Sequence, residues 1–223
     1  MSKKPLLALC CVLLSLGGCA QFDDLMSASA QDDNAATGAE RSVRTDAPYI
    51  NVDARPGTAH LRNVYIEPAN LANMQVIQPE GASADGEWWV TDEEAAILQR
   101  TIAYEYTIAL TFRSAFNIVT TPQQADLLIS TAIVAVHPHE SRASAARDGN
   151  SGGAITASVV VVNAATNAVL VRAVDTVPSD DIWAFNQVQR ENESLSQVFR
   201  LWGENIRLGL LQLQGRSDDP ALQ

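Results

Sequence analysis

The sequence predicts an α+β fold, a two-layer sandwich in which two long helices cover one face of an antiparallel-rich sheet of four to five strands. Three patterns indicate it: a helix-capping motif and amphipathic run from residue 91, a β-hairpin pattern over residues 155–174, and an amphipathic run ending near residue 213. Each helical run has one broad apolar side, and a sheet provides a surface that can bury it.

The first half of the domain is expected to contain one strand and one long helix. In residues 61–68 (LRNVYIEP), Val64 and Ile66 alternate with polar neighbours before a proline, as in a strand. Thr91 and Glu94 have the spacing of a capping box, in which two backbone amides at a helix start are satisfied reciprocally. Apolar residues at steps of three or four then predict a helix to about residue 116: Ala95, Leu98, Ile102, Tyr106, Ala109 and Phe116.

Four further strands are expected in the second half. A short strand at residues 117–120 precedes residues 127–136, which are apolar at nearly every position, as in a covered central strand. Two β-rich runs, residues 155–162 and 169–174, flank a turn at residues 164–167 and predict a hairpin. The outer sheet face is expected to be partly wet because it carries Thr156, Ser158 and Arg172.

The second long helix is expected near the end of the chain. Gly215 is its predicted C-cap. Its apolar positions are Leu195, Val198, Trp202, Ile206 and Leu213.

The N-terminus has the pattern of a secretory signal. Two lysines precede an apolar run over residues 5–16, which is shorter than the roughly 20 residues needed to cross a bilayer. Leu16, Gly17, Gly18 and Cys19 resemble a bacterial lipobox, and this resemblance implies cleavage between Gly18 and Cys19 and a covalent lipid on the Cys19 sulfur. Ala20, by resemblance to the bacterial sorting rule, implies transfer to the outer membrane. The alternative is an ordinary signal peptide with an incidental cysteine.

Charge and composition limit the classes of partner. Lys3 and Lys4 are the only lysines, so removal of residues 1–18 leaves 13 arginines against 26 acidic residues, a net charge of −13 with an acylated N-terminus. Such a chain repels nucleic acid and makes no charge-based contact with anionic lipid. Cys10 and Cys11 leave with the signal, so no intrachain disulfide is expected.

The domain organisation follows from these patterns. Residues 1–18 are expected to be the signal peptide, residues 19–56 the lipidated cysteine and a flexible tether, residues 57–215 a single periplasmic domain, and residues 216–223 a disordered tail. The tether is poor in large apolar residues and cannot offset its ordering entropy. Its segment YINV (Tyr49 to Val52) can dock on the domain edge.

Several motifs of the domain resemble one known family. They are VYIEP, the long helix that begins with acidic residues, ADLLISTAIVAV, and GAITASVVVVNAATNAVLVRAVD. They resemble DUF3313, a family of Gram-negative lipoproteins of unknown function, over about residues 60–213. Gly153, Ala157 and Leu170 match its hairpin pattern, whereas Asn163 and Asn167 replace an acid and a glycine in the turn. LWGENI around Trp202 resembles the terminal motif of the family, with Gly203 in place of alanine. The resemblance implies no catalytic residues.

One loop contains a weak candidate for a metal site. His137 and His139 in an extended segment can place both imidazoles on one side, with Glu140 or Asp148 as a further ligand. The alternative is a polar, flexible loop without a rigid outer shell. No nucleophile elbow or phosphate loop is present. We therefore expect no metal and no cofactor other than the lipid on Cys19.

Two segments concentrate aromatic residues before the helices. Trp88 and Trp89 precede the first long helix, and Trp183 and Phe185 precede the second, so the four can form one patch at the same end of the sheet. Aromatic residues are enriched in protein interfaces, although covering the open end of the core is an alternative role.

These observations lead to three hypotheses about function. The first is an outer-membrane lipoprotein whose periplasmic domain binds another envelope protein or a second copy of itself, without catalysis. The second is a small-ligand or metal-binding envelope enzyme that uses the His137–Glu140 loop. A weaker third hypothesis is an accessory subunit of a secretion or transport assembly, where similar small domains form rings.

Overall fold

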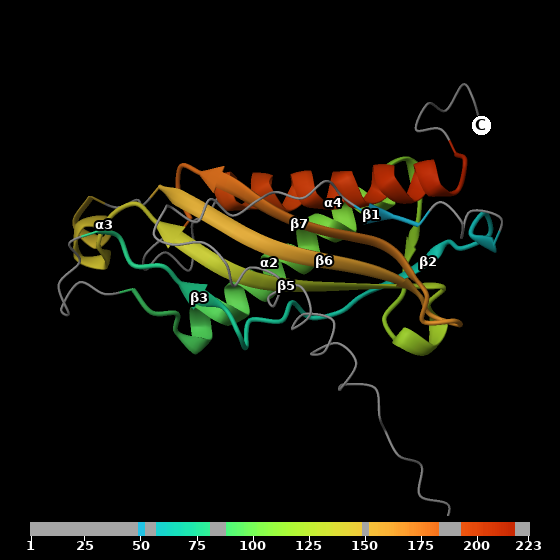
Figure 1. Ribbon diagram of the computed structural model, residues 1–223, viewed down its shortest axis with the longest axis horizontal. Coiled ribbons are helices and arrows are strands. Elements are labelled where there is room, and N and C mark those ends of the chain that lie inside the picture. The colour runs from blue at the N-terminus through green and yellow to red at the C-terminus, as the bar shows by residue number, and fades with distance from the viewer. Residues whose placement is uncertain (1–48, 52–56, 81–87, 149–151, 183–192, 217–223) are drawn as a thin grey trace, which may run out of the picture. The chain divides into compact units, whose positions relative to one another are not determined.

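The computed structural model describes residues 49–51, 57–80, 88–148, 152–182 and 193–216 (Figure 1). The described strands are β1 (Tyr49–Ile50), β2 (Asn63–Ile66), β3 (Gln75–Val76), β4 (Asn117–Ile118), β5 (Leu127–Pro138), β6 (Gly153–Asn163) and β7 (Val169–Ser179). The described helices are α2 (Asp92–Thr111), α3 (Arg142–Asp148) and α4 (Glu193–Leu213), with short 3-10 turns at Phe112–Ser114 and Pro122–Gln124. Among these described helices, none is long and apolar enough to cross a membrane.

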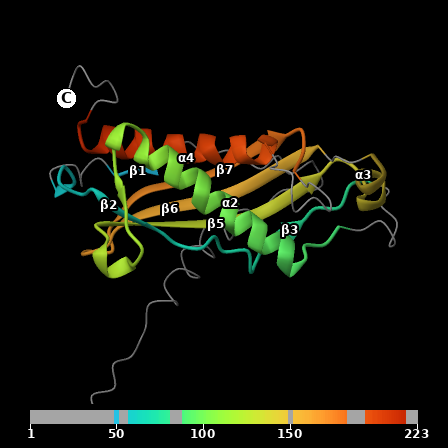
Figure 2. The same cartoon turned by 180° about the vertical axis from the view of Figure 1, so that it is seen from behind.

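The seven strands form one sheet in the order β1-β7-β6-β5-β2-β4, and β3 also pairs with β5. The long strands β5, β6 and β7 pair antiparallel, while β2 and β3 run parallel to β5. Both long helices cover the same face: the sheet lies in front in Figure 1, and α2 and α4 lie in front after the half-turn of Figure 2. The predicted α+β sandwich is therefore confirmed, and the additional strands β1 and β3 are only two residues long.

The first of these short strands comes from the segment that was expected to dock on the domain edge. Tyr49 pairs with Arg172 and Ile50 with Val171, so β1 adds an antiparallel strand to β7. The Asn51 backbone N–H donates a further hydrogen bond of 2.9 Å to a β7 carbonyl. The chain thus enters the domain at the β7 edge of the sheet.

The start of α2 is as predicted, but its end is not. The Thr91 hydroxyl accepts from the Glu94 N–H at 3.2 Å, and the Glu94 carboxylate accepts from the Thr91 N–H at 2.8 Å, which completes the capping box. The prediction of a helix to Phe116 is wrong, because Phe112 has an extended ψ of 129° and Arg113 and Ser114 then adopt positive φ angles of 53° and 55°. A left-handed backbone cannot continue an α-helix, so the chain leaves α2 after Thr111 and turns into β4.

The hairpin turn and the end of α4 confirm two other local predictions. The Asn163 side chain accepts from two turn amides at 2.9 and 3.2 Å, and Asn167 has a φ of 56°, the conformation that asparagine tolerates. Gly215 has a φ of 67°. Its N–H and that of Arg216 donate to the carbonyls of Gln212 and Leu211, which is the Schellman arrangement of a helix end.

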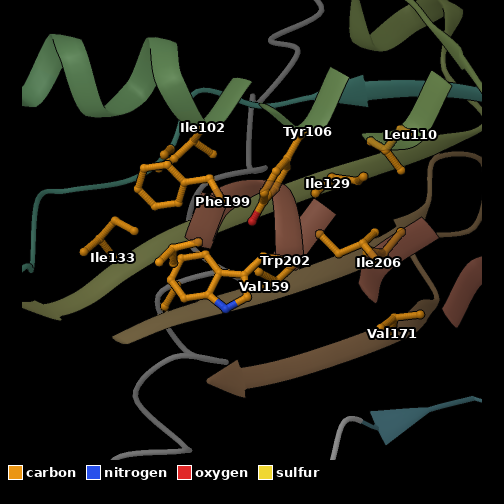
Figure 3. Close-up of a cluster of buried hydrophobic side chains, with 14 of the residues drawn as sticks. Ile102, Tyr106, Leu110, Ile129, Ile133, Val159, Val171, Phe199, Trp202 and Ile206 are labelled. Atoms are coloured by element: carbon orange, nitrogen blue, oxygen red, sulfur yellow. The ribbon is translucent and has the colours of Figure 1, made fainter. Parts of the chain in front are cut away.

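The core lies between the two helices and the inward face of the sheet (Figure 3). The Thr131 hydroxyl donates to the Tyr106 hydroxyl at 3.4 Å, and the Trp202 indole N–H donates to Asp175 at 3.0 Å. Burial raises the pKa of the Tyr106 phenol. The apolar side chains labelled around this contact are Ile102, Leu110, Ile129, Ile133, Val159, Val171, Phe199 and Ile206.

The expectation for the outer sheet face is only partly met. Arg172 is exposed, but Thr156 and Ser158 are buried. Both lie on β6, which has a long strand on each side, and the Thr156 hydroxyl is 2.9 Å from that of Thr176 on β7. Small side chains on a central strand are shielded by their neighbours, so polarity alone does not indicate exposure here.

Candidate functional site

The loop with the candidate metal ligands joins β5 to β6. His137 is half-buried near the end of β5, and burial lowers its pKa. The Glu140 carbonyl accepts from the Trp88 indole N–H at 2.6 Å, and the His139 N–H donates to Gly152. Within the ranges that the structure describes, no three His, Cys, Asp or Glu side chains are grouped so that they could hold a metal ion. The described geometry therefore gives no support to the metal-site or enzyme hypothesis.

The same loop contains α3, and in this part it therefore differs from the flexible loop that was the alternative to a metal site. Arg142, its first residue, forms an ion pair of 3.0 Å with Glu94 and donates to the Trp89 carbonyl. Its guanidinium also lies 4.3 Å from the centre of the Trp89 ring, a cation–π contact. Arg142 thus joins the hairpin loop to the first turn of α2.

The two adjacent tryptophans have different environments. Trp88 is buried, and its backbone N–H and C=O both bond to the Gln78 side chain, at 2.7 and 2.9 Å. It covers the core, as in the alternative role, and is not available as an interface residue. Trp89 is 55 % exposed. Trp183 and Phe185 lie outside the described residues, as do Gly18 and Cys19.

The two long helices run in the same direction and contact each other closely over the second half of α2. Glu105 is buried and forms an ion pair of 2.8 Å with Arg200, which raises the Arg200 pKa. Further along, a Cβ atom at Gly203 would lie 2.8 Å from the Ala109 Cβ. Residue numbers rise together along this contact, so α2 and α4 begin at the same end of the sheet (Figure 2).

Five large apolar side chains of these two helices remain exposed and therefore do not pack against the sheet. We call this set the helix face. Tyr104 is 64 % and Phe112 is 50 % exposed, and the other members are 37 to 46 % exposed. Its members are Tyr104, Ile108 and Phe112 of α2 and Leu201 and Leu208 of α4. Such a surface can bind another apolar surface, and it carries no arrangement of groups for covalent chemistry.

Arginines accompany the helix face. The guanidinium carbons of Arg113 and Arg207 each lie 5.2 Å from the centre of the Phe112 ring. These contacts hold the ring at the point where α2 and α4 approach each other, and they leave half of it open to solvent.

The sequence prediction missed the helix face, although a signal for it exists. Tyr104, Ile108 and Phe112 recur every four residues, and Leu201 and Leu208 are seven apart, so each set lies on one side of its helix. The core-facing set of α2 follows the same spacing on another side. Periodicity identifies both sets but does not tell which of them meets the sheet.

Solved structures with some likeness to the chain come from several bacteria. The hypothetical protein CT253 from Chlamydia trachomatis is 8% identical, with a TM-score of 0.43, over 68% of this chain and 99% of that one. The PelC dodecamer from Paraburkholderia phytofirmans is 11% identical, with a TM-score of 0.36, over 72% and 91%. Lipoprotein GNA1162 from Neisseria meningitidis is 8% identical, with a TM-score of 0.33, over 65% and 97%. All three scores lie below 0.5, so these structures establish neither the fold nor the function.

The family is shown by sequence. No curated protein matches the chain. The sequence profile of one family matches residues 38–206, which include β1 to β7, α2 and most of α4. The chain therefore belongs to the DUF3313 family, whose description is "protein of unknown function".

Proposed function

We propose that the protein is a lipid-anchored protein of the outer membrane whose periplasmic domain binds protein through the helix face, without catalysis. The anchor part of the proposal is supported by the lipobox-like sequence from Leu16 to Cys19. Two or more acyl chains hold a protein stably in a membrane, since each buried CH₂ contributes about 0.8 kcal/mol. Residues 20–48 would then act as the tether between the lipid and β1.

Membrane fractionation and an intact-mass measurement test the lipid anchor on Cys19. Cys19→Ala is expected to abolish attachment to the outer membrane, and the intact mass of the native chain should show diacylglycerol on a chain that begins at Cys19. Ala20→Asp is the matched variant: it keeps the lipid and is expected to shift the protein to the inner membrane. Unchanged membrane attachment of Cys19→Ala would contradict the anchor.

The observation that carries the binding proposal is the helix face. The largest apolar patch on a typical monomer measures about 300–600 Å² and often has a function. Fully burying one large apolar side chain contributes about 1.5–3 kcal/mol, so five partly exposed ones offer a substantial driving force for association. The aromatic and arginine content at Phe112 is typical of the centre of protein interfaces.

A protein partner fits this surface better than a lipid surface does. Helices that lie on membranes have polar sides rich in lysine and arginine. The exposed charges of the long helices are of both signs: they include Glu93 and Glu204 as well as Arg100 and Arg200. Mixed charge around an apolar centre is the usual composition of a protein–protein rim.

A photo-crosslinking amino acid at Leu201 in living cells tests the binding proposal. The expected result is one or a few discrete protein adducts. The same amino acid at Arg172, exposed on β7, is the control and is expected to give none of them. A Leu201 position that gives no protein adduct while the protein is present at its normal level would overturn the proposal.

A further inference from the structure

Six of the exposed side chains of α4 form a pattern that is nearly the same in both directions along the helix, and the exposed Arg200 lies outside this pattern. The centre of the pattern lies between Glu204 and Asn205, and a leucine and a glutamine follow at equal distances on each side. All six side chains are exposed. From one end to the other they are Gln197, Leu201, Glu204, Asn205, Leu208 and Gln212.

The exposed side of α2 has its own centre at the same level. The contacts of Glu105 with Arg200 and of Phe112 with Arg207 show that α2 and α4 advance together. The centre of the α4 pattern therefore lies beside Ala109 and Leu110. Ile108 and Phe112 are placed evenly about Leu110, and Tyr104 lies one turn before this pair. A single line across both helices therefore passes midway between Leu201 and Leu208 on α4 and midway between Ile108 and Phe112 on α2.

We infer that the partner of the helix face is a second copy of this chain, related by a two-fold axis that lies along this line; the inference rests on the proposed function. A two-fold axis across the helices makes the two α4 helices antiparallel. It sets Leu201 against the partner's Leu208, and Ile108 against the partner's Phe112. Every contact in such an interface occurs twice, so the surface must complement itself. The evenly spaced pairs on both helices meet this requirement.

The charges near the axis permit this pairing although the whole chain is acidic, with a formal net charge of −11. Glu204 is the acidic residue next to the axis, and it is one helical turn from Arg200 on its own helix. Its charge contributes to the raised pKa of Arg200. The partner's Asn205, opposite Glu204, is neutral. Like charges therefore do not face each other unscreened at the centre.

The area of the helix face suits the centre of an interface. An aromatic side chain can bury about 150–250 Å², so the exposed parts of Tyr104 and Phe112 and of the three aliphatic residues amount to roughly 300–400 Å². A stable interface buries about 800 Å² on each partner. The helix face would supply the apolar core of such an interface, and the polar residues of the α4 pattern would supply its rim.

A charge exchange tests the register of the two copies. Leu201→Arg and Leu208→Glu, made separately in the full-length lipidated chain, are each expected to weaken the dimer at least tenfold, as measured by sedimentation velocity in detergent. The double variant is expected to recover most of that loss, because position 201 of each copy faces position 208 of the other. Both positions are exposed, so the fold should be unaffected. A native chain that sediments as a monomer, or a double variant weaker than both single ones, would overturn the inference.

Cysteine pairs give an independent readout in isolated envelopes. Asn205→Cys lies next to the axis and is expected to form a disulfide-linked product of twice the chain mass. Gln123→Cys, exposed on a 3-10 turn, is the control and should not form this product. The native chain shows how much product comes from Cys19 alone. If the Asn205→Cys chain forms no more disulfide-linked product than the Gln123→Cys chain, a second copy is excluded as the partner. If Leu201 still crosslinks to a different protein in cells, the proposed function stands and only the second copy is wrong. If it crosslinks to no protein, both fail.

Discussion

Tyr106 places a phenol in the centre of the core, where burial raises its pKa. An unfolded tyrosine ionises near pH 10, whereas the folded protein keeps this phenol protonated, so stability is full below pH 10 and falls as the pH rises above it. The chain has no lysine after Lys4, so the four tyrosines dominate titration in this range. Between pH 9 and pH 11, the free energy of unfolding measured in urea is expected to fall by about 1.4 kcal/mol less for Tyr106→Phe than for the native chain. Equal losses in the two proteins would contradict this role of burial.

Gly203 permits the close contact between the two long helices. A Cβ atom there would meet the Ala109 Cβ at 2.8 Å, so Gly203→Ala is expected to reduce the free energy of unfolding by about 1–2 kcal/mol despite the better helix propensity of alanine. Adding Ala109→Gly removes the clashing methyl group. The double variant should therefore be less destabilised than the sum of the two single variants, as measured by denaturant unfolding. Strict additivity would show that the contact is not the cause.

Among the elements, α3 is held by Arg142 and by the buried Ala145. A seven-residue helix is marginal alone, and this one is fixed to α2 through Glu94 and the Trp89 backbone. Arg142→Ala is expected to increase amide hydrogen exchange over residues 142–148 at least tenfold and to leave β5 and β6 protected. Arg142→Lys is the matched variant, and it should protect only partly because an ammonium group lacks the planar fork of a guanidinium. Unchanged exchange in the alanine variant would show that α3 is held by other contacts.

The elements also show which features a sequence predicts. The capping box at Thr91, the turn at Asn167 and the cap at Gly215 were predictable because each depends on neighbours in the chain. The helix α3 and the strand β3 were not, because distant partners stabilise them. The neighbouring residues Trp88 and Trp89 show the same limit at the candidate site. Only the fold determines that Gln78 and Glu140 hold one of them in the core while the other remains exposed.

At the scale of the whole molecule, the sheet and the helices have separate roles. The chain enters at the β7 edge through β1, whereas the helix face belongs to the two long helices. In the proposed function, the lipid on Cys19 sets where the domain works and the helix face sets what it binds. Removing the lipid should therefore change location without abolishing self-association. Sedimentation of Cys19→Ala is expected to show the same dimer as the native chain, and a monomer would show that association requires the membrane.

The helix face is expected to be covered in the envelope, and cysteine labelling measures whether it is. Tyr104→Cys and Leu201→Cys would be treated in isolated envelopes with a polar maleimide, beside Arg172→Cys and Gln123→Cys on other exposed surfaces. Positions 104 and 201 are expected to label at least several-fold more slowly than 172 and 123, and the difference should disappear in urea. Equal labelling of all four positions in native envelopes would contradict this expectation.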